Sequence, residues 1–128
     1  MSKKLPSFTT LVLDDDEEVV EEVAETIALM GGQVDAFSNP VKCIEYLKTR
    51  RRSYNVLIVD LSMPLLNGLD FLKLASPYIA NSPRQILMTG LAELEGKHVE
   101  SNSMLTVLHK PISISELREK LGHPLRFE

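Results

Sequence analysis

Five short apolar runs, each separated from the next by a segment of helical character, constrain the fold of this chain more than any other feature. The runs occupy residues 11–13, 33–37, 56–59, 85–88 and 105–108. Predominantly apolar runs of this length suit strands that are covered on both faces. The run at 33–37 instead alternates polar and apolar residues, which is typical of a partly exposed strand at the edge of a sheet.

The segments between the runs carry helical spacing and helix-boundary residues. Apolar residues recur at helical spacing through 19–30, and the two glycines that follow are suited to ending a helix. The pattern at 91–103 is weaker, because a glycine interrupts it and few of its positions are apolar. Helix starts are predicted at Asn39-Pro40, at Asn67-Gly68 and at a capping box of Ser113 and Glu116.

The order of these segments, strand then helix repeated five times, predicts an α/β fold. Such alternation favours a parallel sheet with helices on both faces. Right-handed crossovers then bring the C-terminal ends of all the strands to one edge of the sheet. Ligands of open α/β sheets bind in the crevice at that edge. We therefore expect the functional residues to stand where the strands end.

Length, composition and charge set the broad class. The chain has 128 residues, which suits one domain, with a core expected over about 8–122. No apolar run approaches the roughly 20 residues of a membrane span, and residues 1–10 lack the apolar core of a secretory signal. The net charge of −4 disfavours direct nucleic-acid binding. A single cysteine excludes an intrachain disulfide, so a reducing cytoplasm is the expected location.

The strand ends do carry reactive groups. The first, third, fourth and fifth runs are followed by Asp14-Asp15-Asp16, by Asp60, by Thr89 and by His109-Lys110-Pro111. Carboxylates brought close together repel one another unless a cation is present, and oxygen ligands of this kind suit Mg²⁺. Lysine and threonine can contact phosphate oxygens, and an aspartate can attack phosphorus as a nucleophile. This set of residues therefore indicates phosphoryl chemistry.

With these residues the chain resembles the receiver domain of two-component response regulators. The motifs that carry the resemblance are VLDDD (12–16), VLIVDLSMPLLNG (56–68), MTG (88–90) and HKP (109–111). They span nearly the whole chain in the order of that family. The resemblance implies a CheY-like, flavodoxin-like fold, in which a three-layer (βα)₅ sandwich is doubly wound around a five-stranded parallel sheet of order 2-1-3-4-5.

The resemblance also implies a role for each matched residue. Asp60 would accept the phosphoryl group, and Asp14, Asp15 and Asp60 would bind Mg²⁺ together with the backbone carbonyl of Ser62. Thr89 and Lys110 would contact the phosphoryl group, and the Lys110-Pro111 peptide bond would be cis.

The partners that the resemblance implies are a sensor histidine kinase or a phosphotransfer protein as donor, and an output domain or downstream protein as target. Such a domain is not an enzyme beyond its own phosphorylation and dephosphorylation. A homodimer could form through the segment 91–104, the strand at 105–108 and the helix from Ser113. The chain ends six residues after Gly122, which leaves no room here for an output domain, so it is a stand-alone receiver or a piece of a longer protein.

Three positions depart from the family pattern around the switch. Val107 stands where the family often has an aromatic residue, and a β-branched side chain has no large rotamer swing. Gly90 replaces the alanine common after the switch threonine, and 91–104 looks short or mobile as a helix. We therefore expect switching to use backbone and loop movement. Apolar Leu91 is expected to slow dephosphorylation.

Several other conspicuous residues have ordinary structural interpretations. Asp16 is expected to cap a helix, and Cys43 to be a buried or half-buried apolar group. The basic run KTRRR at 48–52 is read as a solvated helix end with no assigned partner. His98 and His123 have no partner cluster and indicate no zinc site.

Two alternative functions remain open from the residues. The fold could serve as a binding module that is never phosphorylated. It could also be an aspartate-nucleophile phosphatase of the haloacid-dehalogenase type that uses Asp14 and Asp16. That class needs threonine or valine two places after the second aspartate, where Glu18 stands, and it leaves Asp60 without a role.

Overall fold

The structure is a computed structural model, and it describes residues 8–90 and 105–122. Five strands and four α-helices alternate in this part of the chain, with one short 3₁₀ helix after the third α-helix. Their bounds are β1 Thr9–Leu13, α1 Glu17–Leu29, β2 Gln33–Phe37, α2 Pro40–Thr49, β3 Val56–Asp60, α3 Gly68–Ala75, η1 Ser76–Tyr78, β4 Arg84–Thr89, β5 Leu105–His109 and α4 Ile114–Gly122.

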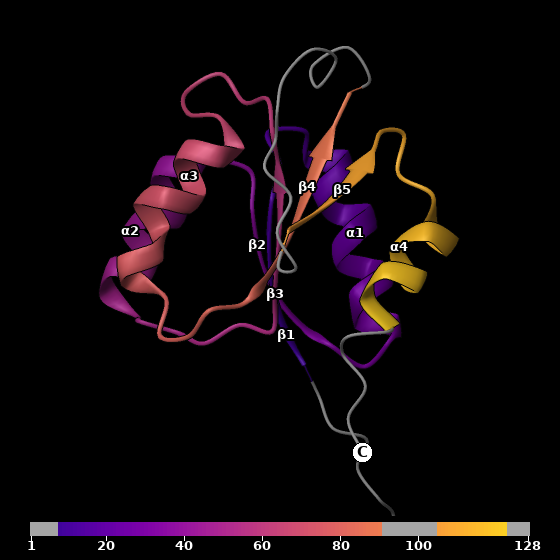
Figure 1. Cartoon of the computed structure of the whole chain (residues 1–128), viewed down its shortest axis with the longest axis horizontal. Helices are drawn as coiled ribbons and strands as arrows, with labels where there is room; N and C mark the ends of the chain where they lie inside the picture. Colours follow the sequence, from indigo (N-terminus) through magenta and orange to yellow (C-terminus); the bar gives the residue numbers. More distant parts are fainter. Residues whose placement is uncertain (1–7, 91–104, 123–128) are drawn as a thin grey trace, which may run out of the picture.

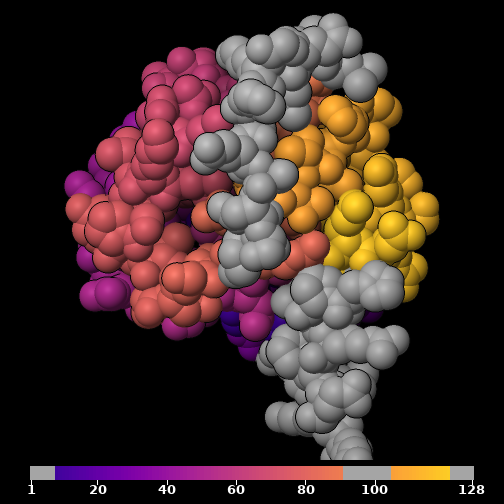
Figure 2. All heavy atoms as spheres, viewed as in Figure 1, coloured from indigo at the N-terminus to yellow at the C-terminus, as the bar shows by residue number. Residues whose placement is uncertain are grey.

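The strands form one parallel sheet in the order β2-β1-β3-β4-β5, which confirms the predicted fold class. Helices α2 and α3 cover one face of the sheet, and α1 and α4 cover the other (Figure 1). In the all-atom view, α2 and α3 form one side of the molecule and α4 the opposite side (Figure 2). The expected helix in 91–104 lies outside the described residues.

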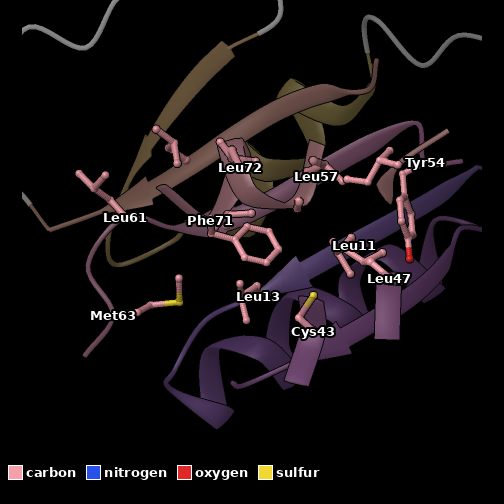
Figure 3. Packing of buried hydrophobic residues seen from close by; sticks show 14 residues of the cluster. Leu11, Leu13, Cys43, Leu47, Tyr54, Leu57, Leu61, Met63, Phe71 and Leu72 are labelled. Atoms are coloured by element: carbon pink, nitrogen blue, oxygen red, sulfur yellow. The ribbon is translucent and has the colours of Figure 1, made fainter. Parts of the chain in front are cut away.

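Side chains of alternating direction along the strands divide the core into two clusters. On the α2–α3 face, Leu11, Leu57 and Val59 pack against Phe71 and other apolar residues of those helices. Figure 3 shows this cluster, with Phe71 in its middle and Tyr54 at the opposite end from Leu61 and Met63. The cluster on the α1–α4 face comprises Phe8, Val12, Val23, Ile27, Val56, Ile58, Ile86, Met88, Leu108, Leu117 and Leu121. Both faces of β3 are therefore buried, as its uninterrupted apolar sequence predicts.

The predicted helix caps are confirmed by hydrogen bonds. The side chains of Asp16, Asn39 and Asn67 each accept from backbone N–H groups in the first turn of α1, α2 and α3. Ser113 Oγ accepts from the backbone N–H of Glu116, 3.3 Å away, at the start of α4. After α1, Gly31 has φ +88°, a conformation that glycine adopts at no steric cost.

The strands extend further than the apolar runs that predicted them. Asp60, Thr89 and His109 are the last residues of β3, β4 and β5, whereas the sequence placed them just after these strands. Each forms part of the backbone ladder, as Asp60 pairs with Met88 and Thr89 pairs with His109. The reason is that polar side chains at a strand end interrupt the apolar pattern without interrupting the backbone hydrogen bonds. Among the described residues, no helix is both long and apolar enough to cross a membrane.

Candidate acidic phosphoryl site

Three aspartates meet at the C-terminal edge of the sheet. Asp14 follows β1 and is completely buried, Asp60 ends β3 and is 3% exposed, and Asp15 is exposed to solvent. Each offers a carboxylate oxygen, and these oxygens all lie within 4.8 Å of one another. The juxtaposition arises because β1 and β3 are adjacent and parallel, with Leu13 paired with Val59. The sheet register thus brings together carboxylates that are 46 residues apart in the sequence.

Lys110 joins the two buried carboxylates. Its Nζ lies 2.8 Å from Asp14 Oδ2 and 3.1 Å from Asp60 Oδ1. The other oxygen of Asp14 accepts a hydrogen bond from the backbone N–H of Asp16 at 2.9 Å. Lys110 follows β5, and its backbone N–H donates to the carbonyl of Thr89 at 2.7 Å. The Lys110-Pro111 peptide bond is cis, as the family resemblance implied.

Thr89 is buried at the end of the strand next to Asp60. Its hydroxyl donates to the carbonyl oxygen of Gly90 at 2.9 Å. Val107 lies on β5, where its backbone partner is Leu87, two residues before Thr89. Val107 and Gly90 are both half-buried. The structure therefore places Thr89 and Val107 on the neighbouring strands β4 and β5, with Gly90 directly after β4. Leu91 and the segment 91–104 lie outside the described residues.

The charges in this site are unbalanced. Burial, followed by the charge of Asp14, raises the pKa of Asp60 to about 7, although Lys110 acts in the opposite direction. Burial alone would lower the pKa of Lys110, but its hydrogen bonds and charge interactions with Asp14 and Asp60 raise it overall. Among the residues that the structure describes, the three carboxylates are thus matched by a single ammonium group, that of Lys110.

This donor set fits Mg²⁺. The ion prefers oxygen ligands at about 2.1 Å and usually keeps several waters. Carboxylate oxygens as close as those of Asp14, Asp15 and Asp60 can contact one such ion. Because only Asp15 of the three is exposed, one side of the cluster faces solvent, where waters and a phosphate oxygen could complete the coordination.

The other acids of the run 14–22 stand apart from this cluster. Asp16 is committed to capping α1, where its side chain accepts from Glu18 N–H at 2.9 Å. Glu17, Glu18, Glu21 and Glu22 are exposed, as predicted for a solvated helix face. His109 is likewise exposed at its strand end. Cys43 is buried, and burial raises the pKa of its thiol to about 12, which agrees with an inert packing role.

The remaining predicted residue, Ser62, lies in the loop after Asp60, and Gly68, the first residue of α3, stands at the end of that loop. Ser62, the predicted carbonyl ligand, is exposed in this loop. Gly68, which the sequence indicated only as part of a turn, donates its N–H to the carbonyl of Leu61 at 2.8 Å. The only hint of this in the sequence is that the first residue of the helix is a glycine, although most residues are tolerated at that position.

Comparison with known proteins gives one family. The sequence model of the response regulator receiver domain matches residues 10–122. A segment of 63 residues is 33% identical to the transcriptional regulatory protein CpxR homolog of Haemophilus influenzae. That segment is 49% of this chain and only 26% of the length of the CpxR homolog.

Solved structures share the same architecture. The receiver domain of the Francisella response regulator 1452 is 26% identical, with a TM-score of 0.72 over 90% of this chain and 93% of that one. A CheY-like receiver domain from Methylobacillus flagellatus is 21% identical, with a TM-score of 0.76 over 91% of this chain and 98% of that one. At 21% identity, the similarity to the Methylobacillus flagellatus structure shows a shared fold and nothing further.

Proposed function

Because this chain belongs to the response regulator receiver domain family, we propose that it is a phosphorylation switch in which Asp60 accepts a phosphoryl group. The observation that carries this proposal is the placement of Lys110 Nζ between Asp14 and Asp60, at 2.8 Å and 3.1 Å. A structural ion pair needs one carboxylate for one lysine. Two buried carboxylates on one lysine, with a third carboxylate beside them at the C-terminal edge of a parallel sheet, suit a site that receives a cation and a phosphoryl group.

The donor would be a phosphohistidine on a sensor histidine kinase or phosphotransfer protein. A carboxylate oxygen of Asp60 forms the new bond to phosphorus as the bond from phosphorus to the imidazole nitrogen breaks. The electron pair of that bond returns to the imidazole ring, and Asp60 becomes an acyl phosphate. Asp60 is the proposed acceptor because it matches the acceptor position of the family motif, at the end of β3, the central strand of the sheet.

The neighbouring residues would hold the reacting group. Asp14, Asp15, Asp60 and the carbonyl of Ser62 would bind Mg²⁺, which when bound neutralises charge on the transferring phosphoryl group. Lys110 would move from Asp60 toward a phosphoryl oxygen and remain paired with Asp14. The Thr89 hydroxyl would exchange its present acceptor, the Gly90 carbonyl, for another phosphoryl oxygen.

Loss of the Thr89–Gly90 hydrogen bond on phosphorylation would change the conformation of the backbone after β4. Val107 has a stiff side chain, so we expect backbone movement to carry the change toward β5 and α4. A partner or output domain would read that surface, and the proposed homodimer would use the same face together with 91–104, which is outside the described residues. The match of the family model to residues 10–122 supports a single receiver domain over about 8–122.

The test is phosphorylation by acetyl phosphate with Mg²⁺, followed by intact-mass measurement. We expect one phosphoryl group on the wild-type chain and none on Asp60→Asn. The matched control is Asp16→Asn, since asparagine caps helices as well as aspartate does. It should be phosphorylated like the wild type.

Two other outcomes would support different functions. A wild-type chain that takes up no phosphoryl group from either acetyl phosphate or a phosphotransfer protein supports a phosphorylation-independent binding module. Steady phosphate release that survives Asp60→Asn and stops in Asp14→Asn supports the phosphatase. The commitment of Asp16 to capping α1 already argues against the phosphatase.

A further inference from the structure

The first residue of α3, Gly68, packs directly on the backbone of the proposed phosphoacceptor. A Cβ atom built on Gly68 would overlap the carbonyl oxygen of Asp60 and lie 3.1 Å from both the Asp60 carbonyl carbon and the Leu61 Cα. Real Cβ atoms do not approach backbone this closely, so any side chain at Gly68 requires something to move. The glycine is needed for this contact and not for its conformation, since Gly31 alone among the described glycines has positive φ.

The strand side of this contact is held in place. Asp60 is in register with Met88 on β4, and the Leu61 N–H donates to the Met88 carbonyl at 2.8 Å. Every residue of β3 is buried, with neighbouring strands on both sides. The backbone of Asp60 therefore cannot retreat without breaking the centre of the sheet.

The helix side is held almost as firmly. Phe71 and Ala75 of α3 are completely buried in the cluster of the α2–α3 face, where Figure 3 shows Phe71 surrounded by its neighbours. The Asn67 side chain caps the helix by accepting from the Asp70 N–H at 2.9 Å. The loop of 61–67, which contains Ser62, is closed at its base by the hydrogen bond from Gly68 N–H to the Leu61 carbonyl.

We propose that Gly68 is a positioning residue, whose missing side chain seats α3 on the Asp60 backbone and thereby sets the loop that carries Ser62 beside the three aspartates. This inference rests on the proposed function of Asp60. A methyl group at Gly68 would displace the start of α3 and the loop, because these are less constrained than β3. The Asp60 carboxylate and the Ser62 carbonyl would then no longer be placed for the same ion.

The experiment compares Gly68→Ala with Gly31→Ala. Gly31 is exposed, lies far along the chain from the site and has no atom within 4 Å of an added Cβ, so its replacement strains only the backbone at positive φ. Two quantities are measured on each folded protein. They are the Mg²⁺ dissociation constant, by calorimetry, and the rate of phosphorylation by acetyl phosphate.

We expect Gly68→Ala to weaken Mg²⁺ binding and to slow phosphorylation by about 10- to 100-fold, the scale of a small misplacement of reacting groups. Gly31→Ala should lower the unfolding temperature and leave both quantities at their wild-type values. Measurements at 10 °C with trimethylamine N-oxide keep a destabilised variant folded. A Gly68→Ala protein that remains unfolded there would show a general packing defect and overturn the positioning role.

The outcomes separate this inference from the proposed function. If wild type and Gly68→Ala are phosphorylated equally fast and bind Mg²⁺ equally well, the positioning role is wrong and the function of Asp60 stands. If neither is phosphorylated, the proposed function fails. A Mg²⁺ affinity that falls only in Gly68→Ala would then still support the positioning role, and equal affinities would overturn it.

Discussion

Two aspartates of the same sheet, Asp35 on β2 and Asp60 on β3, have opposite electrostatic surroundings. Asp35 lies on the edge strand β2, and one of its oxygens receives three groups. Tyr54 Oη donates to it at 2.7 Å, Tyr46 Oη donates at 3.4 Å, and Arg52 Nε forms an ion pair at 3.4 Å. Asp60 lies on the central strand among two other carboxylates and shares its one lysine with Asp14.

The titration behaviour of the neighbours reflects this contrast. Burial and then the hydrogen bond to Asp35 raise the pKa of Tyr54, so that hydroxyl remains a proton donor. Asp35 also raises the pKa of the Arg52 guanidinium. The pKa of Asp60 itself is raised, chiefly by burial and by Asp14. Among the described residues, the Asp35 cluster has nearly balanced charges, whereas the Asp60 cluster keeps an excess of negative charge that a bound cation would balance.

The largest expected effect is the loss of stability in Asp35→Ala. The substitution removes the acceptor of the fully buried Tyr54 hydroxyl and leaves the Arg52 guanidinium without its carboxylate. We expect a loss of about 3 kcal/mol in the free energy of unfolding, measured by urea denaturation, and most of it should come from the unsatisfied Tyr54 hydroxyl, since the Arg52 side chain is 36% exposed. Glu21→Ala, which removes an exposed carboxylate from α1, is the control and should change stability by less than about 0.5 kcal/mol. Equal effects of the two substitutions would contradict the balanced-cluster interpretation.

For Asp60→Asn in metal-free buffer we expect the free energy of unfolding to rise, whereas Asp35→Ala should lower it. The folded-state pKa of Asp60, about 7, lies above the value of about 3.9 in the unfolded chain, so the folded state binds the extra proton. The protonated Asp60 carboxyl group therefore contributes fully to stability below about pH 4, and this contribution is lost as the pH rises through 7. Asp60→Asn should therefore gain stability relative to wild type as the pH rises from 4 to 8.

The measurement is urea denaturation of both proteins with EDTA at pH 4, 6 and 8. The difference between the two free energies of unfolding isolates the contribution of Asp60, because all other groups are shared. A difference that is constant with pH would mean that the Asp60 carboxylate is no less favourable in the folded state than in water.

The smallest expected effects come from the two tyrosines that share Asp35. Tyr54→Phe removes a short hydrogen bond at a side chain that is 1% exposed, and we expect a loss of about 1 kcal/mol. Tyr46→Phe removes a 3.4 Å hydrogen bond at a half-buried ring, and should cost less than about 0.5 kcal/mol. Thermal or urea unfolding of both variants gives the comparison, and a larger loss in Tyr46→Phe would reverse the assigned order.

The sequence by itself determined the five strands, the four helices of the described residues with their caps, and the residues gathered at the site. Strand burial follows from runs such as Val56–Val59, and helix boundaries follow from short-range signals such as Asn67 and Gly31. These signals act over a few residues and do not depend on distant partners. Asp14, Asp60 and Lys110 were also predicted, because parallel topology brings strand ends to one edge whatever the details of packing.

Only the tertiary structure decided how each polar group is balanced and which glycine has a steric role. Tyr54 and Asp35 are 19 residues apart, and nothing in the local pattern of either indicates that the two side chains meet. The overlap that excludes a side chain at Gly68 depends on how α3 docks on β3. Both features arise from packing between elements, where distances of a few tenths of an ångström decide whether a contact is favourable, and local sequence patterns do not specify distances of that kind.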